Sequence, residues 1–554
     1  MEKLQLQDWT KEQLVDEVAR LRKRKKYGLV WEDKLEDVVE QCKTELPVLK
    51  EVKNKAIVKD KNGPMNILIE GDNYHALSVL NYTHNGKIDV IYIDPPYNTG
   101  NKDFKYNDKY VDREDTYRHS KWLSFIEKRL VLAKYLLKKT GLIFISIDDN
   151  EQARLKLLCD EIFREDNFVA DLVWENKEGG GSSDSKHFKI KHEYILVYAR
   201  NKEMTLIGRE DITDEDAYTH TDKFEKTRGK HKLIKLNSAS IQYSKTLDYP
   251  IGAPDKSKIL PSYGKKRACW RWSKEKLVWG IRNDFIKIIK DRNGKWAVYS
   301  KQYLKVDNEN NPIERQKAPL GIIPFFSSTM ATKQLESIFH KKVFDYSKPY
   351  LLIEYLLKLS TDKNSIVLDF MAGSGTTGHA TLQLNKEDRG HRRFILCTDN
   401  ENKIATDVCY PRIAKVVGGY KDAKGKKIAG LGGNLKYFHT AFVGAEPNDK
   451  NKEALTKQAT EMLCMREDTF ELVKETEAVK IFKNSKQHTG IVFDEDTIPA
   501  LKKEITKIGG VWSVYIFSLG DDTFEDEFED MRQKITVAPI PEAILRVYRR
   551  LFKP

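Results

Sequence analysis

An aspartate, two prolines and a tyrosine, Asp94-Pro95-Pro96-Tyr97, come directly after the apolar, β-branched run Ile88–Ile93. That run predicts a buried parallel strand, and ligand sites in open α/β sheets lie at the carboxyl ends of such strands. The prolines remove backbone donors and stiffen the turn, so we expect a carboxylate, free carbonyls and an aromatic ring in a fixed array. A stiff turn that merely ends a core strand is the alternative interpretation.

Such an array suits chemistry at the exocyclic amino group of a nucleobase. That nitrogen is a weak nucleophile because its lone pair is delocalised into the ring, and two acceptors that hold its hydrogens favour the more reactive pyramidal form. The Asp94 carboxylate and the Pro95 carbonyl are the candidate acceptors, and the Tyr97 ring offers a stacking face worth ~1–3 kcal/mol. Because the amino group of adenine is sequestered in a duplex, the base has to be extruded.

A glycine-rich turn follows another predicted strand, in the second half of the chain. Residues 369–377 read DFMAGSGTT and come after the strand predicted at 365–368. Gly373 and Gly375 let the backbone turn tightly and approach a ligand, and the helix predicted at Thr377–Leu384 offers free N–H groups at its start. Those donors suit the carboxylate of an amino-acid-bearing cofactor. The spacing matches neither the dinucleotide fingerprint nor the phosphate loop.

Buried strands and one long helix indicate the scaffold that positions both turns. Short apolar runs predict strands at Asn66–Glu70, Leu142–Ile147, Tyr194–Tyr198 and Arg393–Thr398. An apolar stripe at helical spacing predicts a helix at Ser120–Lys138. Strands and helices in this order predict an α/β sheet.

Composition and periodicity divide the chain into five regions. Residues 204–342 interrupt the α/β pattern with weak periodicity and mixed basic and aromatic residues, which indicates an inserted domain. The other predicted regions are an N-terminal helical region (1–60, with a basic helix at 10–26), the two halves of the α/β domain (61–203, with a glycine-serine loop at 179–183, and 343–440) and an α+β C-terminal domain (441–554). An acidic run at 521–530 repels phosphate.

Charge and cysteine usage favour a cytoplasmic protein with a polyanionic partner. The 554 residues carry a formal net charge of +13, which suits phosphates, although ordinary solubility charge is the alternative. The six cysteines form no CxxC pair, so we expect no zinc site or disulfide framework, and no metal. The chain has no apolar run of the ~20 residues that span a membrane, so we expect none.

The motif order resembles that of the β class of amino-group DNA methyltransferases. In that class the target-base motif comes first, then a target-recognition domain, then the cofactor loop, which is a circularly permuted order. More locally the chain resembles the modification subunit of type III restriction–modification systems. This likeness lies in Lys25–Glu32, Asp94–Gly100 and His192–Tyr198.

The resemblance implies a Rossmann-like sheet with helices on both faces that binds S-adenosylmethionine and transfers its methyl group to N6 of a flipped adenine. Asp94, Pro95, Pro96 and Tyr97 then form the target-base pocket. The implied cofactor-binding residues are Asp72, Lys348, Pro349, Asp369, Phe370, Gly373, Gly375, Thr376 and Asp399, with Glu401 as the alternative to Asp399 at the ribose.

We expect sequence recognition to lie in the inserted domain. Its candidate DNA-binding residues are Lys265, Lys266, Arg267, Trp270 and Arg271, with core packing as the alternative for the tryptophan. The resemblance also implies double-stranded DNA as substrate, a homodimer, a partner contact through the C-terminal domain, and a type III restriction subunit with helicase and nuclease modules. Methylation of cytosine N4 or of RNA, and DNA recognition without catalysis, remain alternatives.

Overall fold

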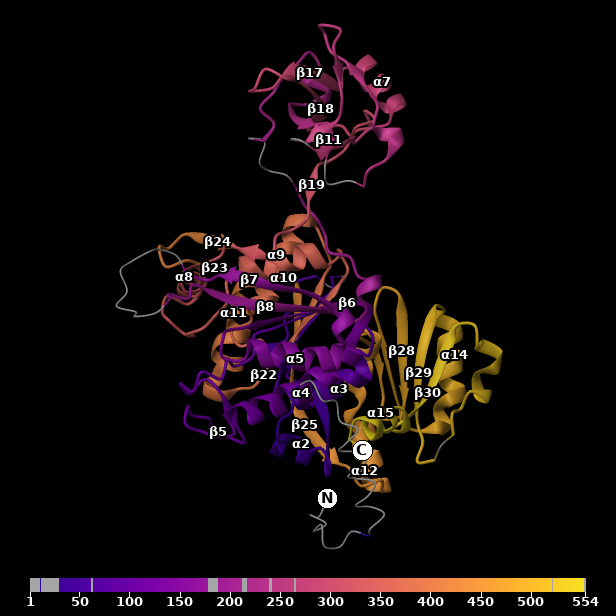
Figure 1. Ribbon diagram of the computed structural model, residues 1–554. Coiled ribbons are helices and arrows are strands. Elements are labelled where there is room, and N and C mark those ends of the chain that lie inside the picture. The colour runs from indigo at the N-terminus through magenta and orange to yellow at the C-terminus, as the bar shows by residue number, and fades with distance from the viewer. Residues whose placement is uncertain are drawn as a thin grey trace. The chain divides into compact units, whose positions relative to one another are not determined.

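The computed structural model (Figure 1) describes Thr10 and residues 29–60, 63–177, 188–211, 217–238, 242–263, 266–520 and 522–552. The chain forms two compact units, residues 208–319 and the remainder, which we call the small unit and the large unit. The predicted helix at 10–26 (apart from Thr10), the predicted loop at 179–183 and Lys265 lie outside the described residues.

In the described part of the chain, the large unit is built on one ten-stranded mixed sheet. Its strands are, in spatial order, β1 (Glu45–Glu51), β25 (Asn434–Gly444), β2 (Met65–Glu70), β22 (Arg393–Thr398), β21 (Ile366–Asp369), β3 (Ile88–Ile93), β6 (Leu137–Ile147), β8 (His192–Ala199), β7 (Phe168–Glu175) and β20 (Ile322–Ile323). All neighbours from β25 to β6 are parallel, whereas β1 and β8 run antiparallel to theirs. The two chain halves interleave, because β21 and β22 lie between β2 and β3.

Helices cover both faces of this sheet (Figure 1). Along β3, Ile91 and Ile93 join one hydrophobic layer while Val90 and Tyr92 join another, which is the two-residue alternation of a buried strand. One layer contains α3 (Asn73–Thr83), α4 (Arg118–Leu136) and α5 (Gln152–Phe163). The opposite layers contain α9 (Tyr350–Ser360), α10 (Thr376–Asp388) and α11 (Tyr410–Gly418). The predicted α/β sheet with helices on both faces is confirmed.

The predicted elements differ from the observed ones mainly at their ends. The helix predicted at 120–138 is α4, which ends at Leu136. The strand predicted to begin at Leu142 is β6, which begins at Leu137, where a register shift against β3 accommodates the added residues. The N-terminal region contributes the short helix α2 (Asp37–Gln41) and the strand β1.

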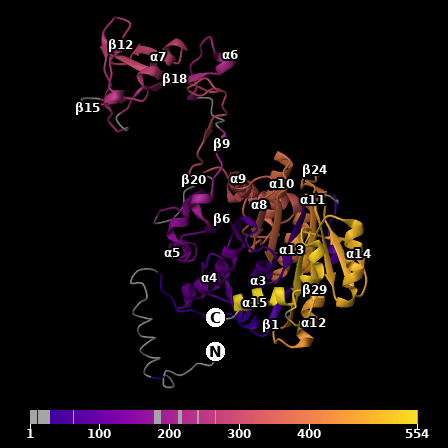
Figure 2. The same ribbon diagram turned by 90° about the vertical axis from the view of Figure 1, so that its right-hand side faces the viewer.

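The C-terminal residues form a second sheet that packs on the first. Its strands are, in spatial order, β26 (Glu471–Glu475), β27 (Val479–Lys483), β28 (Gln487–Val492), β29 (Val511–Phe517) and β30 (Ile535–Ile540), accompanied by α12 (Asp449–Gln458), α13 (Thr460–Glu467), α14 (Ile498–Ile508) and α15 (Glu542–Phe552). Helix α15 lies beside α3 and β1 (Figure 2), and its Tyr548 hydroxyl donates to the Pro47 carbonyl at 2.5 Å. The C-terminal region therefore shares its core with the large sheet.

The small unit has a core of its own. Strands β10 (His231–Lys235), β18 (Trp296–Tyr303) and β17 (Ile286–Lys290) form an antiparallel sheet, and α7 (Lys274–Arg282) packs against it. Trp270, Trp272 and Phe285 are buried in this core. The predicted boundaries of the insert, 204 and 342, remain predictions.

All six cysteines are buried and free of disulfides. Across the described ranges, no helix is both long and apolar enough to cross a membrane.

Candidate active site

Four neighbouring parallel strands bring four carboxylates to one edge of the large sheet. The order β2-β22-β21-β3 places the residues that end or follow these strands side by side: Asp72, Asp399, Asp369 and Asp94. All four line one cleft of about 900 Å³. Asp94 and Asp369 are 275 positions apart in the sequence, and they meet because β21 pairs directly with β3. The carboxyl edge of the sheet therefore carries the candidate site, as the general rule for open α/β sheets requires.

The Asp94 carboxylate forms an ion pair with the ammonium group of Lys348. The Lys348 Nζ donates to both carboxylate oxygens, at 2.8 and 2.9 Å. Only 24% of the Asp94 side chain and 9% of the Lys348 side chain are exposed, so water screens this pair little. Burial raises the pKa of Asp94, and the neighbouring ammonium of Lys348 offsets part of that rise. The ammonium thus favours the ionised carboxylate at a place where burial alone favours the protonated form.

The rest of the Asp-Pro-Pro-Tyr turn is fixed by side chains that the sequence motif does not contain. The Pro96 carbonyl accepts a hydrogen bond from the Trp122 indole at 2.7 Å. Asn98, with a φ of 57°, is fully buried and donates to Glu151 Oε1 at 2.6 Å. All four motif residues line the cleft, so the predicted target-base residues are brought together.

Glu193 is a second carboxylate at this turn, and the sequence prediction gave it no role. Its Oε2 lies 3.4 Å from Lys348 Nζ and accepts a hydrogen bond from the Tyr97 hydroxyl at 2.9 Å. Its Oε1 accepts one from Asn176 Nδ2 at 2.6 Å. A glutamate at the start of the mostly apolar strand β8 is the signal that could have identified it. Two fixed carboxylates therefore share one ammonium group.

The glycine-rich turn leads from β21 into α10, and β21 is the direct neighbour of β3, which the Asp-Pro-Pro-Tyr turn follows. Gly373 and Gly375 both have positive φ, 47° and 78°, which explains the glycines. A Cβ at Gly373 would come 3.2 Å from the Phe344 ring. Gly375 caps α10 at its N-terminus, and Thr376 is the first helical residue. Gly373 and Thr376 line the cleft.

Asp369 and Phe370 hold the glycine-rich turn in place, the first through hydrogen bonds and the second through burial in the core. Asp369 accepts hydrogen bonds from the Thr377 hydroxyl at 2.5 Å and the Met371 N–H at 3.0 Å. It is almost fully buried, and burial raises its pKa to about 7 although those two hydrogen bonds favour the ionised form. Phe370 is fully buried in the core. These two residues therefore shape the turn, and Asp369 also lines the cleft.

A buried arginine holds the hydroxyl groups of the turn. Arg412 of α11 is fully buried and donates through Nη1 to the hydroxyls of Ser374, at 3.0 Å, and Thr376, at 2.8 Å. The Ser347 hydroxyl lies 3.0 and 3.1 Å from the same two oxygens. Within the described residues no ion pair is formed by Arg412, and burial lowers its pKa to about 10. The turn therefore lies beside a positive charge that forms no ion pair with a carboxylate in the described part of the chain.

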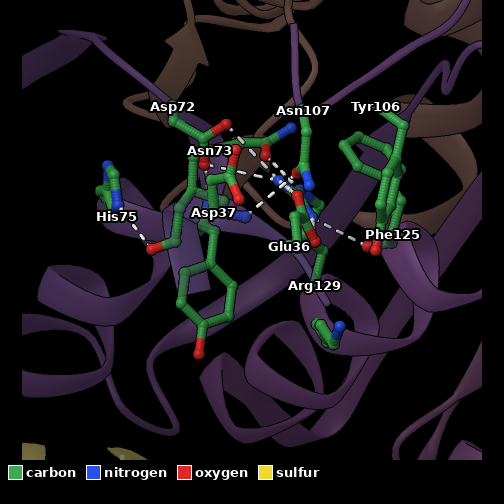
Figure 3. Close-up of polar contacts among 12 residues, drawn as sticks. Glu36, Asp37, Asp72, Asn73, His75, Tyr106, Asn107, Phe125 and Arg129 are labelled. Atoms are coloured by element: carbon green, nitrogen blue, oxygen red, sulfur yellow. Dashed lines mark hydrogen bonds and ion pairs between the residues drawn. The ribbon is translucent and has the colours of Figure 1, made fainter. Parts of the chain in front are cut away.

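Asp72 meets the cleft beside a second buried arginine (Figure 3). It caps α3 by accepting a hydrogen bond from the Tyr74 N–H at 2.7 Å. Arg129 is fully buried and donates to both oxygens of Glu36, at 2.6 and 3.0 Å, while its Nη2 lies 3.4 Å from Asp72 Oδ2. Glu36 therefore takes the main share of the Arg129 charge, and Asp72 remains an anionic acceptor.

The residues Glu36, Asp37 and Val38 also line the cleft. Their backbone is tied down by long-range contacts: the Asp37 N–H donates to Asn107 Oδ1 at 3.0 Å, and the Val38 carbonyl lies 3.0 Å from His75 Nε2 (Figure 3). The sequence analysis gave these residues no part in the site. Their contacts are with distant segments of the chain, which a local sequence pattern does not reveal.

The two candidate ribose acids lie side by side but differ in their contacts. Asp399 accepts a hydrogen bond from the Glu401 N–H at 3.1 Å, and both residues line the cleft. The Glu401 carboxylate is paired with Lys105 Nζ at 2.6 Å. Asp399 is therefore the better placed to accept hydrogen bonds from a ligand.

Lys348 and Pro349 differ in placement. Pro349 is the residue before α9, outside the lining of the cleft, whereas Lys348 contributes its ammonium group to Asp94. The assignment of Lys348 to the cofactor remains a prediction, since its observed contacts are with the target-base motif.

The candidate DNA-binding residues lie in the small unit. Lys266 and Arg267 form β15 (Lys266–Arg267), and Arg271 is exposed just after β16 (Cys269–Trp270). Trp270 is buried, and its indole N–H donates to the Tyr249 carbonyl at 2.7 Å. Its side chain is thus part of the core of the small unit.

With this geometry in place, comparison with known proteins identifies the class. The chain belongs to the DNA methylase family, whose N6_N4_Mtase model matches residues 88–457. It is 36% identical over 388 residues to the Mod subunit of the type III restriction–modification enzyme EcoPI from Escherichia phage P1, an alignment that covers 62% of this chain and 59% of that protein.

Two further relatives show the same family. The chain is 33% identical to the type III StyLTI Mod subunit of Salmonella typhimurium, over 67% of this chain and 58% of that protein. It is 34% identical to the type II methyltransferase M.KpnI of Klebsiella pneumoniae, over 61% of this chain and 82% of that protein. The predicted resemblance to modification subunits is confirmed. The chain spans about three fifths of the length of the two Mod subunits.

Proposed function

We propose that this protein is a DNA methyltransferase that uses S-adenosylmethionine to methylate the N6 amino group of adenine. The observation that carries this proposal is the single cleft that holds both Asp94 and the glycine-rich turn. One segment offers acceptors for an amino group, and the other offers glycines and a helix start for a cofactor. Transfer between two ligands requires that both be held together.

The donors and acceptors of the cleft fit S-adenosylmethionine. A volume of about 900 Å³ lies within the usual range for ligand sites. The start of α10, with Arg412 behind its hydroxyls, suits the carboxylate of the methionine moiety. Asp72 and Asp399 suit the adenine amino group and the ribose hydroxyls. When bound, this cofactor supplies an electrophilic methyl group on a sulfonium.

The residues of the turn would orient the target amine. Asp94 and the Pro95 carbonyl accept its two hydrogens, and the Tyr97 ring stacks on the extruded base. The ionised carboxylate stabilises the positive charge that develops on nitrogen as the new bond forms. Because the group is buried, each of these interactions is stronger than it would be in water.

Adenine N6 is the preferred acceptor on the strength of the aspartate at the first position of the motif. By the resemblance, an aspartate there is typical of adenine-N6 enzymes and a serine of cytosine-N4 enzymes. Cytosine N4 is the second candidate, because its amino group needs the same two acceptors. The matched family covers methylases of both kinds, as its name N6_N4 records.

The small unit is proposed as the DNA-recognition module. Its residues 208–319 carry 25 Lys and Arg against 15 Asp and Glu, so this fifth of the chain holds +10 of the net charge of +13. Positive charge releases counterions from phosphates and gives affinity without sequence preference. Arg271, Lys266 and Arg267 are the proposed contacts, and Lys274 and Arg282 of α7 are further basic residues of the small unit and are exposed.

We further propose the role of a modification and recognition subunit in a type III restriction–modification system. The similarity to the Mod subunits of the type III enzymes EcoPI and StyLTI supports it. A homodimer, a restriction subunit with helicase and nuclease modules, and a docking role for the C-terminal sheet belong to the same proposal. The buried, unpaired cysteines fit the reducing cytoplasm.

The test is to incubate the protein with methyl-labelled S-adenosylmethionine and unmethylated duplex DNA, and then to identify the labelled nucleoside. The proposal expects N6-methyl-2′-deoxyadenosine. Labelled N4-methyl-2′-deoxycytidine would transfer the assignment to cytosine. Tight duplex binding without any transfer would leave only a recognition function, and labelling of RNA alone would overturn the DNA substrate.

A further inference from the structure

Lys348, Glu193 and Asp94 form an arrangement in which one cation has two anionic partners. The ammonium group lies 2.8 and 2.9 Å from the two Asp94 oxygens and 3.4 Å from Glu193 Oε2. Only 17% of the Glu193 side chain is exposed, so water competes weakly for any of the three groups. The shorter contacts show that the ammonium favours Asp94 in this structure.

The Glu193 carboxylate is held more firmly in place than the Lys348 ammonium. Glu193 is fixed from the far side by the Tyr97 hydroxyl and by Asn176, at 2.9 and 2.6 Å. The Lys348 side chain has four rotatable bonds, and the faces of Tyr97 and Trp174 lie 4.8 and 5.9 Å from its nitrogen. Aromatic faces attract a cation without fixing its position. A small displacement of the ammonium can therefore exchange Asp94 for Glu193.

An ammonium on Asp94 opposes the chemistry that the turn is proposed to do. A carboxylate whose two oxygens are both bonded to a cation is a weaker acceptor for the hydrogens of an amine, and it resists protonation. The reaction needs Asp94 as an acceptor first and as a proton acceptor afterwards.

On the basis of the proposed function, we propose that Lys348 moves from Asp94 to Glu193 when the target base enters, which makes Glu193 a positioning residue for methyl transfer. The amino nitrogen then forms its bond to the methyl carbon while the carbon–sulfur bond breaks and leaves its electron pair on sulfur. The extra proton on nitrogen passes to the Asp94 carboxylate and is lost to water when the product leaves. Tyr97 couples the two events, because it both stacks on the base and donates to Glu193.

Three variants test this movement: Glu193→Gln, Lys348→Met and the double variant. Glu193→Gln keeps an acceptor for Tyr97 but no longer attracts the ammonium, so Lys348 stays on Asp94. We expect kcat to fall about 10–100-fold while the Kd for S-adenosylmethionine, measured by calorimetry without DNA, is unchanged. Glu175→Gln, on the exposed end of the neighbouring strand β7, is the matched control and keeps wild-type kcat.

The double variant shows whether Glu193 and Lys348 act together or independently. If Glu193 acts only by receiving Lys348, then removing it from the Lys348→Met protein costs nothing further. Losses that multiply in the double variant would overturn the proposal. A raised Kd for the cofactor in the Lys348→Met protein would also overturn the proposal, because it would show that Lys348 binds the cofactor.

Two controls keep the result interpretable. The melting temperatures of all variants are compared with wild type, and unchanged cofactor binding shows that the cleft has formed. If Glu193→Gln folds, binds cofactor and transfers methyl at the wild-type rate, the inference fails and the methyltransferase function stands. If the wild-type protein transfers no methyl group to nucleic acid, the proposed function itself fails.

Discussion

The cleft of the large unit and the positively charged small unit, for which we propose different functions, carry their charges in different ways. In the cleft, charge lies on single, largely buried groups with defined partners, as with Lys348 and Asp94 at 2.8 Å. In the small unit, positive charge is spread over exposed side chains, whereas its buried Lys301 is already paired with Asp222 at 2.8 Å. From this difference we infer that reaction geometry depends on single residues, whereas attraction to a polyanion depends on the total charge of many residues.

The sharpest test of this contrast is Asp94→Ala, with the largest expected effect. Removing the carboxylate deprives the amine of its charged acceptor, and we expect kcat to fall by at least about 10³-fold. Cofactor affinity, measured by calorimetry, should stay within a few-fold of wild type. A variant that keeps substantial transfer would show that the cleft does not use this residue.

Arg412→Met should produce the next largest effect, on the cofactor rather than on the base. Its guanidinium holds the hydroxyls of Ser374 and Thr376, so its loss should raise the Kd for S-adenosylmethionine about 10–100-fold. Lys415→Met is the control on the same helix, because the Lys415 ammonium donates to the Ile338 carbonyl at 2.9 Å, lies 4.9 Å from the Phe339 ring and does not contact the turn. Equal effects of the two changes would reduce the role of Arg412 to helix packing.

Replacing Arg271, Lys274 and Arg282 together by alanine should weaken DNA binding without changing the cofactor Kd. Each lost phosphate contact should lower the salt dependence of log Kd by about 0.9, which is measured by titrating labelled duplex at several salt concentrations. A triple variant of the C-terminal region, with alanine at Lys486, Lys503 and Lys507, removes the same exposed charge. If both triple variants lose affinity equally, the small unit has no special share in binding.

Asp369→Asn should have the smallest effect on methyl transfer, because the change expected is in stability and its pH dependence. Because burial raises the folded-state pKa of Asp369 to about 7, the folded state binds the extra proton and loses stability as pH rises from about 4 to about 7. The total is on the order of a few kcal/mol. Asparagine carries no charge, so thermal melts of the variant should lack this decline. If the stability of the variant declined with pH as that of the wild type does, the decline could not be assigned to Asp369.

Local patterns predicted the elements and singled out Asp94, whereas the roles of Asp72, Asp369 and Asp399 were implied by the family resemblance. Apolar runs identified β3 and β22 with the observed bounds, Ile88–Ile93 and Arg393–Thr398, and the carboxyl ends of parallel strands share an edge. The contacts of the carboxylates were not predictable in this way. Lys348 meets Asp94 across 254 positions, and Arg129 meets Glu36 across 93, at distances that depend on how α4 and α9 pack.

In the small unit, even the secondary structure could not be predicted from the sequence. Its short strands lack the long alternation that identifies a buried sheet, so the sequence predicted an insert rich in charge and aromatics and no architecture. Trp270 illustrates the ambiguity, since a tryptophan among basic residues suits a DNA surface as well as a core, and the structure places it in a core.

The most direct test of the central claim is a crystal structure with sinefungin, an analogue that carries an amine in place of the methyl-bearing sulfonium. We expect its amino-acid end to lie against Gly373 and Thr376, and its amine-bearing carbon to face the Asp94 carboxylate. Binding outside this cleft, or within it with that carbon turned away from Asp94, would contradict the proposed placement of cofactor and base.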